Sequence, residues 1–423
     1  MTRKRLAIVG SGISGMASAW FLRHDYDVTL FEKDHRVGGH SNTVMVPENS
    51  TTIPVDTGFM VYNEVTYPLL TRLFKELAVT TQPTKMSFSV QHLNDSLEFN
   101  GGSINLLFGQ RSNLLSIRYW KMLLQINRFN KETVEELQTP HYGDMPLREY
   151  VKARGYGNDF LKWYLSPMAA AVWSSPPERI ENFPARTLMR FWHNHGFLGL
   201  DTQHPWRTVT GGSRQYVQKL TAAYTERIER GAAVAAITQL ESQRSRLTLE
   251  DGNQMDFDRV VIATHADQAL SILADATPLE RDLLPKFPYQ KNTAVLHTDA
   301  SVMPKNRRCW AAWNYKIDAQ NRCSTHYWMN ELQNVSQLDH YFVSINPSAE
   351  PAVEKVKSRL AYEHPLFDLQ SSAAQERLPE LHRAGDETGR YFCGAWQRYG
   401  FHEDGLFSAV NACTQLLKKD PWP

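Results

Sequence analysis

Three glycines near the start of the chain have the spacing that a pyrophosphate-binding turn requires. Gly10, Gly12 and Gly15 lie in the segment GSGISG. The first glycine permits a tight turn, the second lets the backbone approach a pyrophosphate, and the third lets a helix pack closely on a strand. The pyrophosphate then lies at the helix N-terminus, where free N–H groups and the helix dipole favour an anion. The spacing predicts a dinucleotide site; the alternative is a glycine-rich turn without a ligand.

The segments around these glycines supply the elements that the motif needs. Residues 6–9 predict a strand, residues 13–22 have the apolar spacing of a helix, and residues 28–32 predict a second strand. Glu32 ends the second strand, where its carboxylate would accept hydrogen bonds from the ribose hydroxyls of adenosine. The same carboxylate would repel a 2′-phosphate, so the pattern disfavours NADP.

Further motifs follow this unit in order and at plausible spacing. They are the paired glycines of residues 32–40, the Asp-Thr-Gly of residues 55–60, the Gly-Gly turn of residues 208–213, a strand at residues 232–234, and residues 390–406. Together they resemble the flavin amine oxidase superfamily, which includes monoamine oxidases, protoporphyrinogen oxidase, phytoene desaturases and flavin-dependent fatty acid isomerases. Four stretches also resemble a bacterial group of NAD/FAD-binding oxidoreductases associated with the modification of membrane-lipid acyl chains: residues 56–63, 167–175, 327–330 and 394–406.

The resemblance implies that the cofactor is FAD, bound without a covalent link. The residues expected to contact it are Gly10, Gly12, Ile13, Ser14, Gly15, Glu32, Lys33, Gly39, His40, Ser41, Gly58, Phe59, Met60, Val234, Gly394, Asp404, Gly405 and Leu406. Two positions depart from the family. His40 stands where members often have Arg, so a phosphate contact there should be weaker or sensitive to pH. Gly394 is followed by Ala395 and Trp396 instead of a glutamate, which indicates a branch distinct from the amine oxidases proper.

The order of the motifs predicts an α/β fold with a Rossmann-type FAD-binding domain in three segments and a discontinuous α+β substrate domain. The FAD-binding segments are expected at residues 1–80, 205–270 and 386–423, and the substrate segments at residues 81–204 and 271–385. Within these segments, residues 216–228 and 406–419 predict helices, and residues 285–385 form an aromatic region expected to be irregular.

The function that this pattern favours is FAD-dependent oxidation, or desaturation, of an apolar and unsaturated acyl or isoprenoid substrate. A second dinucleotide fingerprint is absent, because Gly155 and Gly157 follow no strand and Gly211 and Gly212 have the wrong spacing. Substrate is therefore expected to reduce the flavin, with oxygen or a quinone as electron acceptor. The alternatives are a fatty acid double-bond isomerase, an amine oxidase, and a flavin-bearing protein that binds a partner without turnover.

Candidate catalytic and substrate residues come from the segments that should border the flavin. His402 and Glu403 are the catalytic candidates, since His suits proton transfer near neutral pH. Each also has a structural interpretation, as a cap or a first-turn charge of the following helix. Tyr62, Trp396 and Tyr399 are the candidate walls of a substrate pocket, although Tyr62 and Trp396 also suit an ordinary core. A metal site is not expected, because His193 and His195 lack a third ligand nearby.

The bulk composition limits the kinds of partner and the location that can be expected for this protein. Lys and Arg total 46 against 45 Asp and Glu, for a net charge of +1. This balance argues against a nucleic acid partner, which usually needs a basic excess. The start of the chain lacks the features of a signal peptide, and no window reaches the roughly 18–20 apolar residues of a membrane span, so a cytoplasmic location is expected. The oligomeric state is not indicated.

Residues 104–129 alternate large apolar side chains with cations. Arg111, Arg118, Lys121 and Arg128 lie among Leu, Ile, Phe and Trp residues. Such a segment suits peripheral contact with the inner face of a membrane, where a lipid substrate would be found. It also suits an amphipathic helix that covers the substrate domain, and that second interpretation is favoured because such helices are common.

Overall fold

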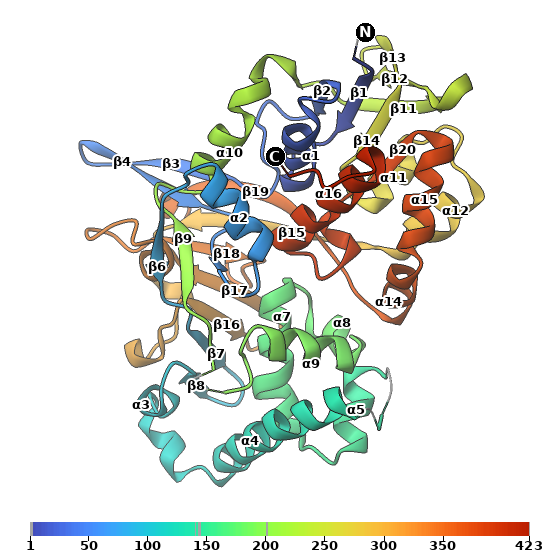
Figure 1. The fold of residues 1–423 in the computed structure, drawn as a ribbon. Helices are drawn as coiled ribbons and strands as arrows, with labels where there is room; N and C mark the ends of the chain where they lie inside the picture. The colour runs from blue at the N-terminus through green and yellow to red at the C-terminus, as the bar shows by residue number, and fades with distance from the viewer. Residues whose placement is uncertain (1–2, 140, 143–144, 200–201, 423) are drawn as a thin grey trace.

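The computed structural model describes residues 3–139, 141–142, 145–199 and 202–422. One part of it is built on a five-stranded sheet in which every pairing is parallel (Figure 1). In spatial order the strands are β10 (Ile228–Arg230), β2 (Asp27–Glu32), β1 (Arg5–Val9), β14 (Arg259–Ile262) and β20 (Arg390–Phe392). The central strands are continuous apolar runs because both faces of a parallel sheet are covered. Strands from the start, middle and end of the chain thus meet in one sheet.

The glycine-rich turn leads from β1 into α1 (Ile13–Leu22), and every residue of this helix is buried. It packs against α16 (His402–Leu417) and α10 (Arg214–Thr221). A helix enclosed on all sides is apolar all round, which explains its composition. On the opposite face of the sheet lie further elements: β11 (Val234–Gln239), β12 (Ser245–Leu249), β13 (Gln254–Phe257), α11 (Ala266–Ile272), α12 (Pro278–Leu283), α14 (Leu369–Glu376) and α15 (Leu378–Thr388).

The other part of the molecule is built on a seven-stranded sheet, antiparallel except for the parallel pair of β16 and β7. In order its strands are β19 (Val356–Pro365), β15 (Tyr289–His297), β18 (Phe342–Ile345), β17 (Cys323–Trp328), β16 (Trp313–Ile317), β7 (Phe88–His92) and β8 (Leu97–Asn100). A helical layer packs beside its β16–β7–β8 end (Figure 1). The helices are α3 (Ile104–Leu107), α4 (Ile117–Gln138), α5 (Leu147–Ala153), α6 (Asn158–Phe160), the π-helical Leu161–Leu165, α7 (Ser166–Trp173), α8 (Pro177–Glu181) and α9 (Ala185–Asn194).

Smaller elements join the two parts. They are the hairpin β3 (Thr43–Glu48) and β4 (Thr51–Asp56), the three-stranded sheet of β5 (Tyr62–Asn63), β9 (Trp206–Val209) and β6 (Thr81–Thr84), and the helices α2 (Pro68–Glu76) and α13 (Met329–Gln333). The largest apolar core cluster contains residues of both parts, so their interiors are continuous.

The α/β fold class is confirmed, but three expectations about single elements were wrong. Residues 285–385 are not irregular, because they supply β15 to β19; buried polar residues such as Asn314 and Thr325 hide the apolar pattern of these strands. The α-helix expected at 216–228 ends at Thr221, the chain continues as a 3-10 helix over Ala222–Arg227, and Ile228 already belongs to β10. The last helix begins at His402, before the expected position, because the carboxylate of Asp404 caps its N-terminus.

Candidate functional site

A cavity of about 730 Å³ is lined by residues of both large sheets, a size within the range of small-molecule sites. The part that we call the nucleotide part lies at the carboxyl ends of β1, β2 and β14, where ligands bind in open α/β sheets. It is lined by residues 9–14, 31–34, 232–234 and 263–265. The part that we call the aromatic part is lined by Tyr67, Trp173, Phe191, Phe197, Trp206, Trp313, Tyr327, Tyr399 and Phe401.

The glycine turn forms the floor of the nucleotide part and has room for a ligand at one position. Gly10 has φ +98°, which favours glycine, and a Cβ atom there would lie 2.9 Å from the carbonyl oxygen of Ala263. Gly12 lines the cavity, and a Cβ atom on it would meet no atom within 4 Å. Gly12 is also the N-cap of α1 and provides no side-chain hydrogen bond to the helix. The uncapped N-terminus of this buried helix therefore faces a space that suits a pyrophosphate.

Glu32 lies beside this turn with its carboxylate fixed in place. One carboxylate oxygen accepts a hydrogen bond from the backbone N–H of Ser11 at 2.9 Å and another from the Ser11 hydroxyl. The other oxygen accepts from the backbone N–H of Asp34 at 3.0 Å. A carboxylate has about four acceptor sites, so an acceptor site remains for a ribose hydroxyl. The turn, the helix N-terminus and Glu32 together fit the adenosine diphosphate moiety of FAD.

Three histidines from separate segments also line the cavity: His40, His265 and His364. The ring of His40 stacks on Tyr362 at 4.9 Å between centroids and meets His364 edge-on at 5.2 Å. Burial holds the pKa of His40 well below its usual value and lowers the pKa of His364 to about 4. Burial also lowers the pKa of His265, whose Nδ1 lies 3.2 Å from a carboxylate oxygen of Glu363. Without a bound anion these imidazoles are neutral near pH 7.

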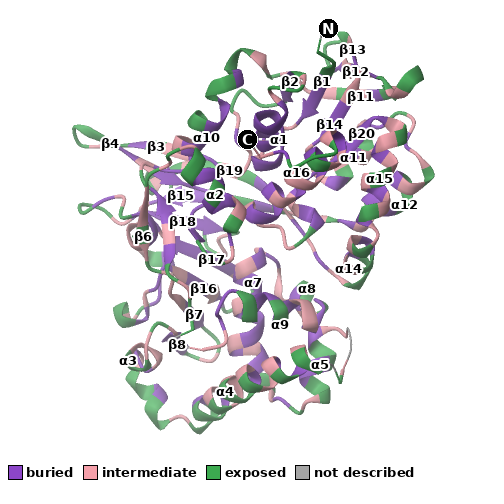
Figure 2. Cartoon of the chain, viewed as in Figure 1, coloured by how far each residue is buried: buried purple, intermediate pink, exposed green. Residues whose placement is uncertain are grey.

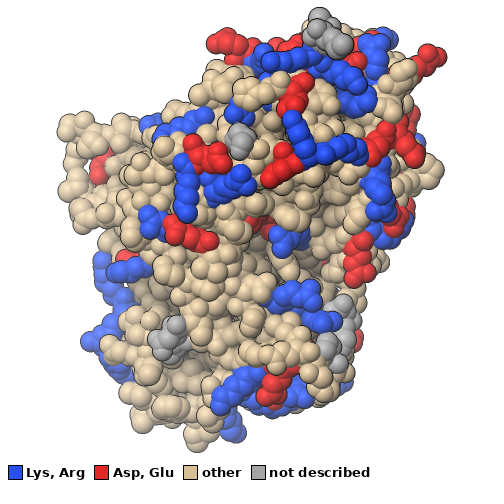
Figure 3. Space-filling view, in the orientation of Figure 1, with Lys and Arg blue, Asp and Glu red and all other residues tan. Residues whose placement is uncertain are grey.

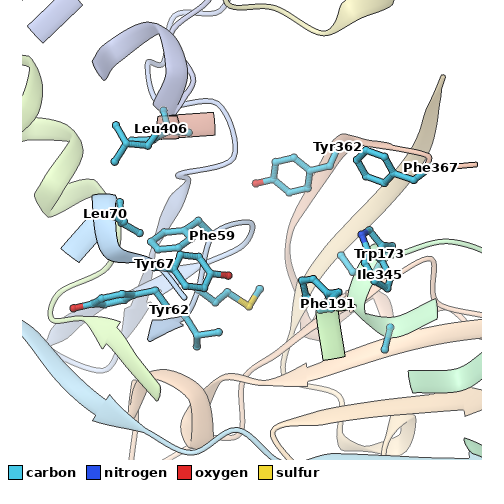
Figure 4. Packing of buried hydrophobic residues seen from close by; sticks show 14 of the residues in the cluster. Phe59, Tyr62, Tyr67, Leu70, Trp173, Phe191, Ile345, Tyr362, Phe367 and Leu406 are labelled. Atoms are coloured by element: carbon cyan, nitrogen blue, oxygen red, sulfur yellow. The ribbon is translucent and has the colours of Figure 1, made fainter. Parts of the chain in front are cut away.

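The aromatic part is apolar and carries no formal charge. Figure 4 shows Phe59 and Tyr67 on one side, facing Trp173 and Phe191 across a gap. Among the described residues that line this part of the cavity, none is Asp, Glu, Lys or Arg. Such walls bind apolar or flat groups through apolar contact and aromatic packing.

Of the three expected substrate-wall residues, Tyr399 and Trp396 line the cavity and Tyr62 does not. Tyr62 is buried behind the wall, where its ring packs edge-on against Phe74 at 5.2 Å and its hydroxyl donates to the Thr81 hydroxyl at 3.3 Å. Tyr67, five residues further along the chain, lines the cavity from the same side. Tyr62 therefore has a core position, as one of the two sequence interpretations allowed.

His402 lies at the cavity wall but is held by neighbouring side chains. Its Nε2 is 2.8 Å from both the Ser41 and the Tyr216 hydroxyl oxygens, and its ring stacks on Phe59 at 3.9 Å. Burial lowers the pKa of His402 to about 3, so the ring is neutral near pH 7. A neutral ring with one nitrogen already engaged suits the positioning of Phe59 better than general acid catalysis.

The catalytic interpretation of Glu403 does not fit its position. Its two carboxylate oxygens accept hydrogen bonds from the backbone N–H groups of Leu69 and Leu70, both at 2.9 Å, in the first turn of α2. Asp404 accepts from the backbone N–H of Phe401 at 2.9 Å, at the start of its own helix. Neither carboxylate lines the cavity. Both acids bind helix N-termini, where orphan N–H groups and the dipole favour them.

The remaining expected cofactor residues fall into two groups. Those that line the cavity, besides the ones described above, are Ile13, Ser14, Lys33, Gly39, Gly58, Phe59, Met60, Val234 and Gly394. Those that lie behind its wall are Gly15, Ser41, Asp404, Gly405 and Leu406. The Ser14 hydroxyl, for example, donates to the carbonyl oxygen of Gly405 at 2.9 Å, which joins α16 to the glycine turn. A direct FAD contact is proposed for the first group only.

Sequence reasoning missed His265, Glu363 and His364. His265 could have been found, because it comes three residues after the end of the apolar strand β14, whose carboxyl end lies at the same sheet edge as the glycine turn. Glu363 and His364 lie on β19, far along the chain, and no local motif marks them. The described residues contain no group of three or more His, Cys, Asp or Glu arranged to hold a metal ion. No helix in this part of the chain combines the length and apolar character that crossing a bilayer requires.

Fold and cavity define a dinucleotide-binding flavoprotein of the Rossmann-like class. The sequence profile of the flavin containing amine oxidoreductases matches residues 13–310. The chain belongs to this family and is a FAD-dependent oxidoreductase. No curated sequence matches it significantly.

Proteins with different enzyme names have solved structures with the same fold. The chain is similar to cyclohexylamine oxidase from Brevibacterium oxydans IH-35A, with a TM-score of 0.69 and 14% identity over 98% of this chain and 100% of the other. It is similar to a conjugated-linoleic-acid-producing fatty acid isomerase from P. acnes, with a TM-score of 0.65 and 14% identity over 96% and 97%. It is also similar to reduced UDP-galactopyranose mutase, with a TM-score of 0.69 and 15% identity over 99% and 94%. These likenesses establish the fold, and the substrate must be argued from the site.

Proposed function

We propose that the protein oxidises an apolar, unsaturated acyl or isoprenoid substrate, introducing a double bond, with oxygen or a quinone as electron acceptor. The observation that carries this proposal is the uncharged aromatic part of the cavity, which adjoins the nucleotide part. An apolar chain would bury its surface there without removing a charged group of this lining from water. The proposal also places the enzyme in the cytoplasm, at the inner face of a membrane, where such substrates are found.

The chain's own residues would hold the cofactor and orient the substrate. Gly12 and the N-terminus of α1 would receive the pyrophosphate, and Glu32 would receive the adenosine ribose. When bound, FAD supplies a hydride acceptor. Trp173 and Phe191 would fix the substrate chain and exclude water, and a fixed approach of the reacting carbon lowers the entropic part of the barrier.

A fatty acid double-bond isomerase is the second candidate. It needs the same apolar cavity, and it would return the hydride to another carbon of the substrate. The likeness to a fatty acid isomerase is compatible with this reaction but reflects the fold alone. An amine oxidase is a weaker candidate, because the aromatic part offers no carboxylate to a cationic amine.

Anaerobic titration of the purified yellow protein tests the proposal. A detergent-dispersed extract of unsaturated lipids is added while the flavin absorbance is followed, and putrescine serves as the amine control. We expect bleaching by the lipid extract and none by putrescine. Double-bond migration in the recovered lipid, with no net bleaching, would favour the isomerase. Bleaching by putrescine alone would support an amine oxidase, and no reaction with any addition would support a flavin-bearing binding protein.

A further inference from the structure

Six large apolar side chains lie exposed on one short segment of the helical layer. The described residues contain twelve exposed large hydrophobic side chains, and half of them fall within residues 104–124. They are Ile104, Leu114, Leu115, Ile117, Trp120 and Leu124, and Leu115 is 90% exposed. We infer that this face, here named the 104–124 face, docks on the surface of an anionic lipid bilayer.

The helix α4 shows why this face is not an ordinary solvated surface. Its inner side packs against the protein, since Tyr119, Met122 and Phe129 are buried. Its outer side presents Ile117, Trp120 and Leu124 at intervals of three and four residues. A helix that only covers a core has a polar outer face. The structure therefore disfavours the covering-helix interpretation that the sequence alone had favoured. Figure 2 shows exposed residues along α4 at the outer edge of the molecule.

The charges that this segment itself carries are of one sign. Residues 104–131 contain no Asp or Glu but five cations: Arg111, Arg118, Lys121, Arg128 and Lys131. The whole chain, by contrast, has a net charge of only +1. In Figure 3, blue side chains interrupt the tan surface at the lower end of the molecule, where α4 lies. Apolar side chains with cations beside them are the pattern of a segment that lies in an anionic membrane interface.

Two of these cations form ion pairs with neighbouring acidic side chains. Arg118 pairs with Asp159 at 2.6 Å, and Arg128 pairs with Glu132 at 2.7 Å. Arg111 donates only to neutral oxygen atoms of Asn105 and Phe108. Lys121 is exposed, and no ion pair of it is found in the described part of the chain. Within the 104–124 face, Arg111 and Lys121 are therefore the cations free to meet lipid phosphates.

A second copy of this chain suits the face less well. In a two-fold dimer the same patch meets itself, so the cations of one copy would lie near the cations of the other. A segment without acidic residues cannot balance those charges. An anionic bilayer supplies the opposite charge and also accepts the apolar side chains. The inference rests on the proposed function in one respect: membrane contact would bring the enzyme to a lipid substrate.

Vesicle sedimentation of the FAD-loaded protein tests the inference. Phosphatidylcholine vesicles are compared with vesicles in which a third of the lipid is phosphatidylglycerol, at low and high salt. We expect at least tenfold tighter binding to the anionic vesicles, and weaker binding at high salt. The combined change Leu115→Ser, Ile117→Ser, Leu124→Ser should weaken binding at least tenfold. Arg111→Glu with Lys121→Glu should abolish the preference for anionic lipid.

The matched control is Leu338→Ser with Val353→Ser, because these side chains are 67% and 84% exposed on other segments. This control should bind vesicles like the unchanged protein, and all variants should keep their FAD. Absence of binding at low salt, or an equal loss in the control, would overturn the inference. So would a dimer in light scattering that the triple serine variant converts to monomer, since the face would then be a protein interface. Flavin reduction by detergent-dispersed lipid needs no vesicle, so it reports separately on the proposed function.

Discussion

A Cβ atom placed on Gly15 would lie 1.8 Å from the carbonyl oxygen of Gly10. These two glycines are therefore needed for the turn itself, because the helix α1 lies against the end of β1. Gly12 differs from both, since a Cβ atom on it would meet nothing within 4 Å and its φ of −64° is open to any residue. The space beside Gly12 is open to a ligand, and the space beside Gly15 is filled by the protein.

This difference predicts opposite outcomes for two substitutions. Gly12→Val should give a folded protein without FAD, because the new side chain would occupy the approach of the pyrophosphate. Gly15→Ala, with its severe backbone clash, should fail to give folded protein. Circular dichroism and flavin absorbance of both variants separate fold from cofactor. A folded, yellow Gly12→Val protein would show that the pyrophosphate does not lie at this turn.

The FAD affinity should depend on pH through His40 and His364. Burial keeps both pKa values low in the FAD-free protein, and a nearby diphosphate would favour the charged imidazoles and raise these pKa values. FAD binding should then take up protons, so the Kd for FAD should fall as the pH is lowered from 8 to 6. The change is at most about tenfold per pH unit for each proton taken up. Lys33, Arg36 and Glu363 also line the cavity.

Isothermal titration at several pH values, in buffers of different ionisation enthalpy, measures this linkage. The variant His40→Arg supplies a fixed cation and should weaken the pH dependence. For folding of the FAD-free protein the sign is different. The unfolded chain binds protons below about pH 6.5, whereas burial lowers the pKa of His364 to about 4 and holds the pKa of His40 well below its usual value. Stability should therefore fall as the pH drops below about 6.5. A Kd for FAD that is constant between pH 8 and 6 would exclude the histidines from the phosphate site.

The sequence predicted those parts of the site whose residues are close together in the chain. The spacing of Gly10, Gly12 and Gly15 and the place of Glu32 are set within one β1–α1–β2 unit, where chain neighbours are also neighbours in space. The sequence could not decide between a substrate wall and the core for Tyr62, because the direction of its side chain depends on the pairing of β5 with β9. That pairing joins segments more than a hundred residues apart, and no local pattern encodes it.

The dependence on pairing between distant segments also explains why the position of Glu403 in the last helix was not predicted. Glu403 follows the candidate His402 in sequence, so both seemed to belong to the flavin site. In space the Glu403 carboxylate turns towards α2, whose first turn comes from residues 68–70. The partner of a buried carboxylate is set by tertiary packing, and the sequence around Glu403 does not contain it.

Removal of the Glu403 carboxylate should therefore affect stability more than chemistry. Glu403→Ala leaves two buried backbone N–H groups of α2 without an acceptor, and hydrogen bonds to charged groups are each worth about 1.5–3 kcal/mol. We expect a loss of about 2–4 kcal/mol in the free energy of unfolding by urea, with anaerobic flavin reduction by substrate retained. Glu376→Ala, at an exposed helix end, is the control and should change stability by less than about 0.5 kcal/mol. If Glu403→Ala abolished flavin reduction in a stable protein, Glu403 would have a catalytic role and the structural interpretation would be wrong.

Neither NADH nor NADPH should reduce the flavin at a useful rate. The chain has one dinucleotide fingerprint, at residues 10–15, and the cavity that contains it is expected to hold FAD. Stopped-flow absorbance under anaerobic conditions, with either nicotinamide nucleotide in excess, measures the rate. Rapid reduction by NADH or NADPH would replace the substrate-first scheme with a reductase or monooxygenase cycle.

The central claim is that the nucleotide part of this cavity holds FAD without a covalent bond. Cys393, which directly precedes the cavity-lining Gly394, is fully buried and does not line the cavity, and its Sγ lies 3.8 Å from the Ser18 hydroxyl. Acid precipitation of natively purified protein, followed by chromatography of the supernatant, tests the claim most directly. The account predicts a colourless pellet and about one FAD per chain in the supernatant, because Glu32 and the glycine turn recognise an adenosine diphosphate that FMN lacks. A yellow pellet, or a supernatant that contains FMN or NAD in place of FAD, would contradict it.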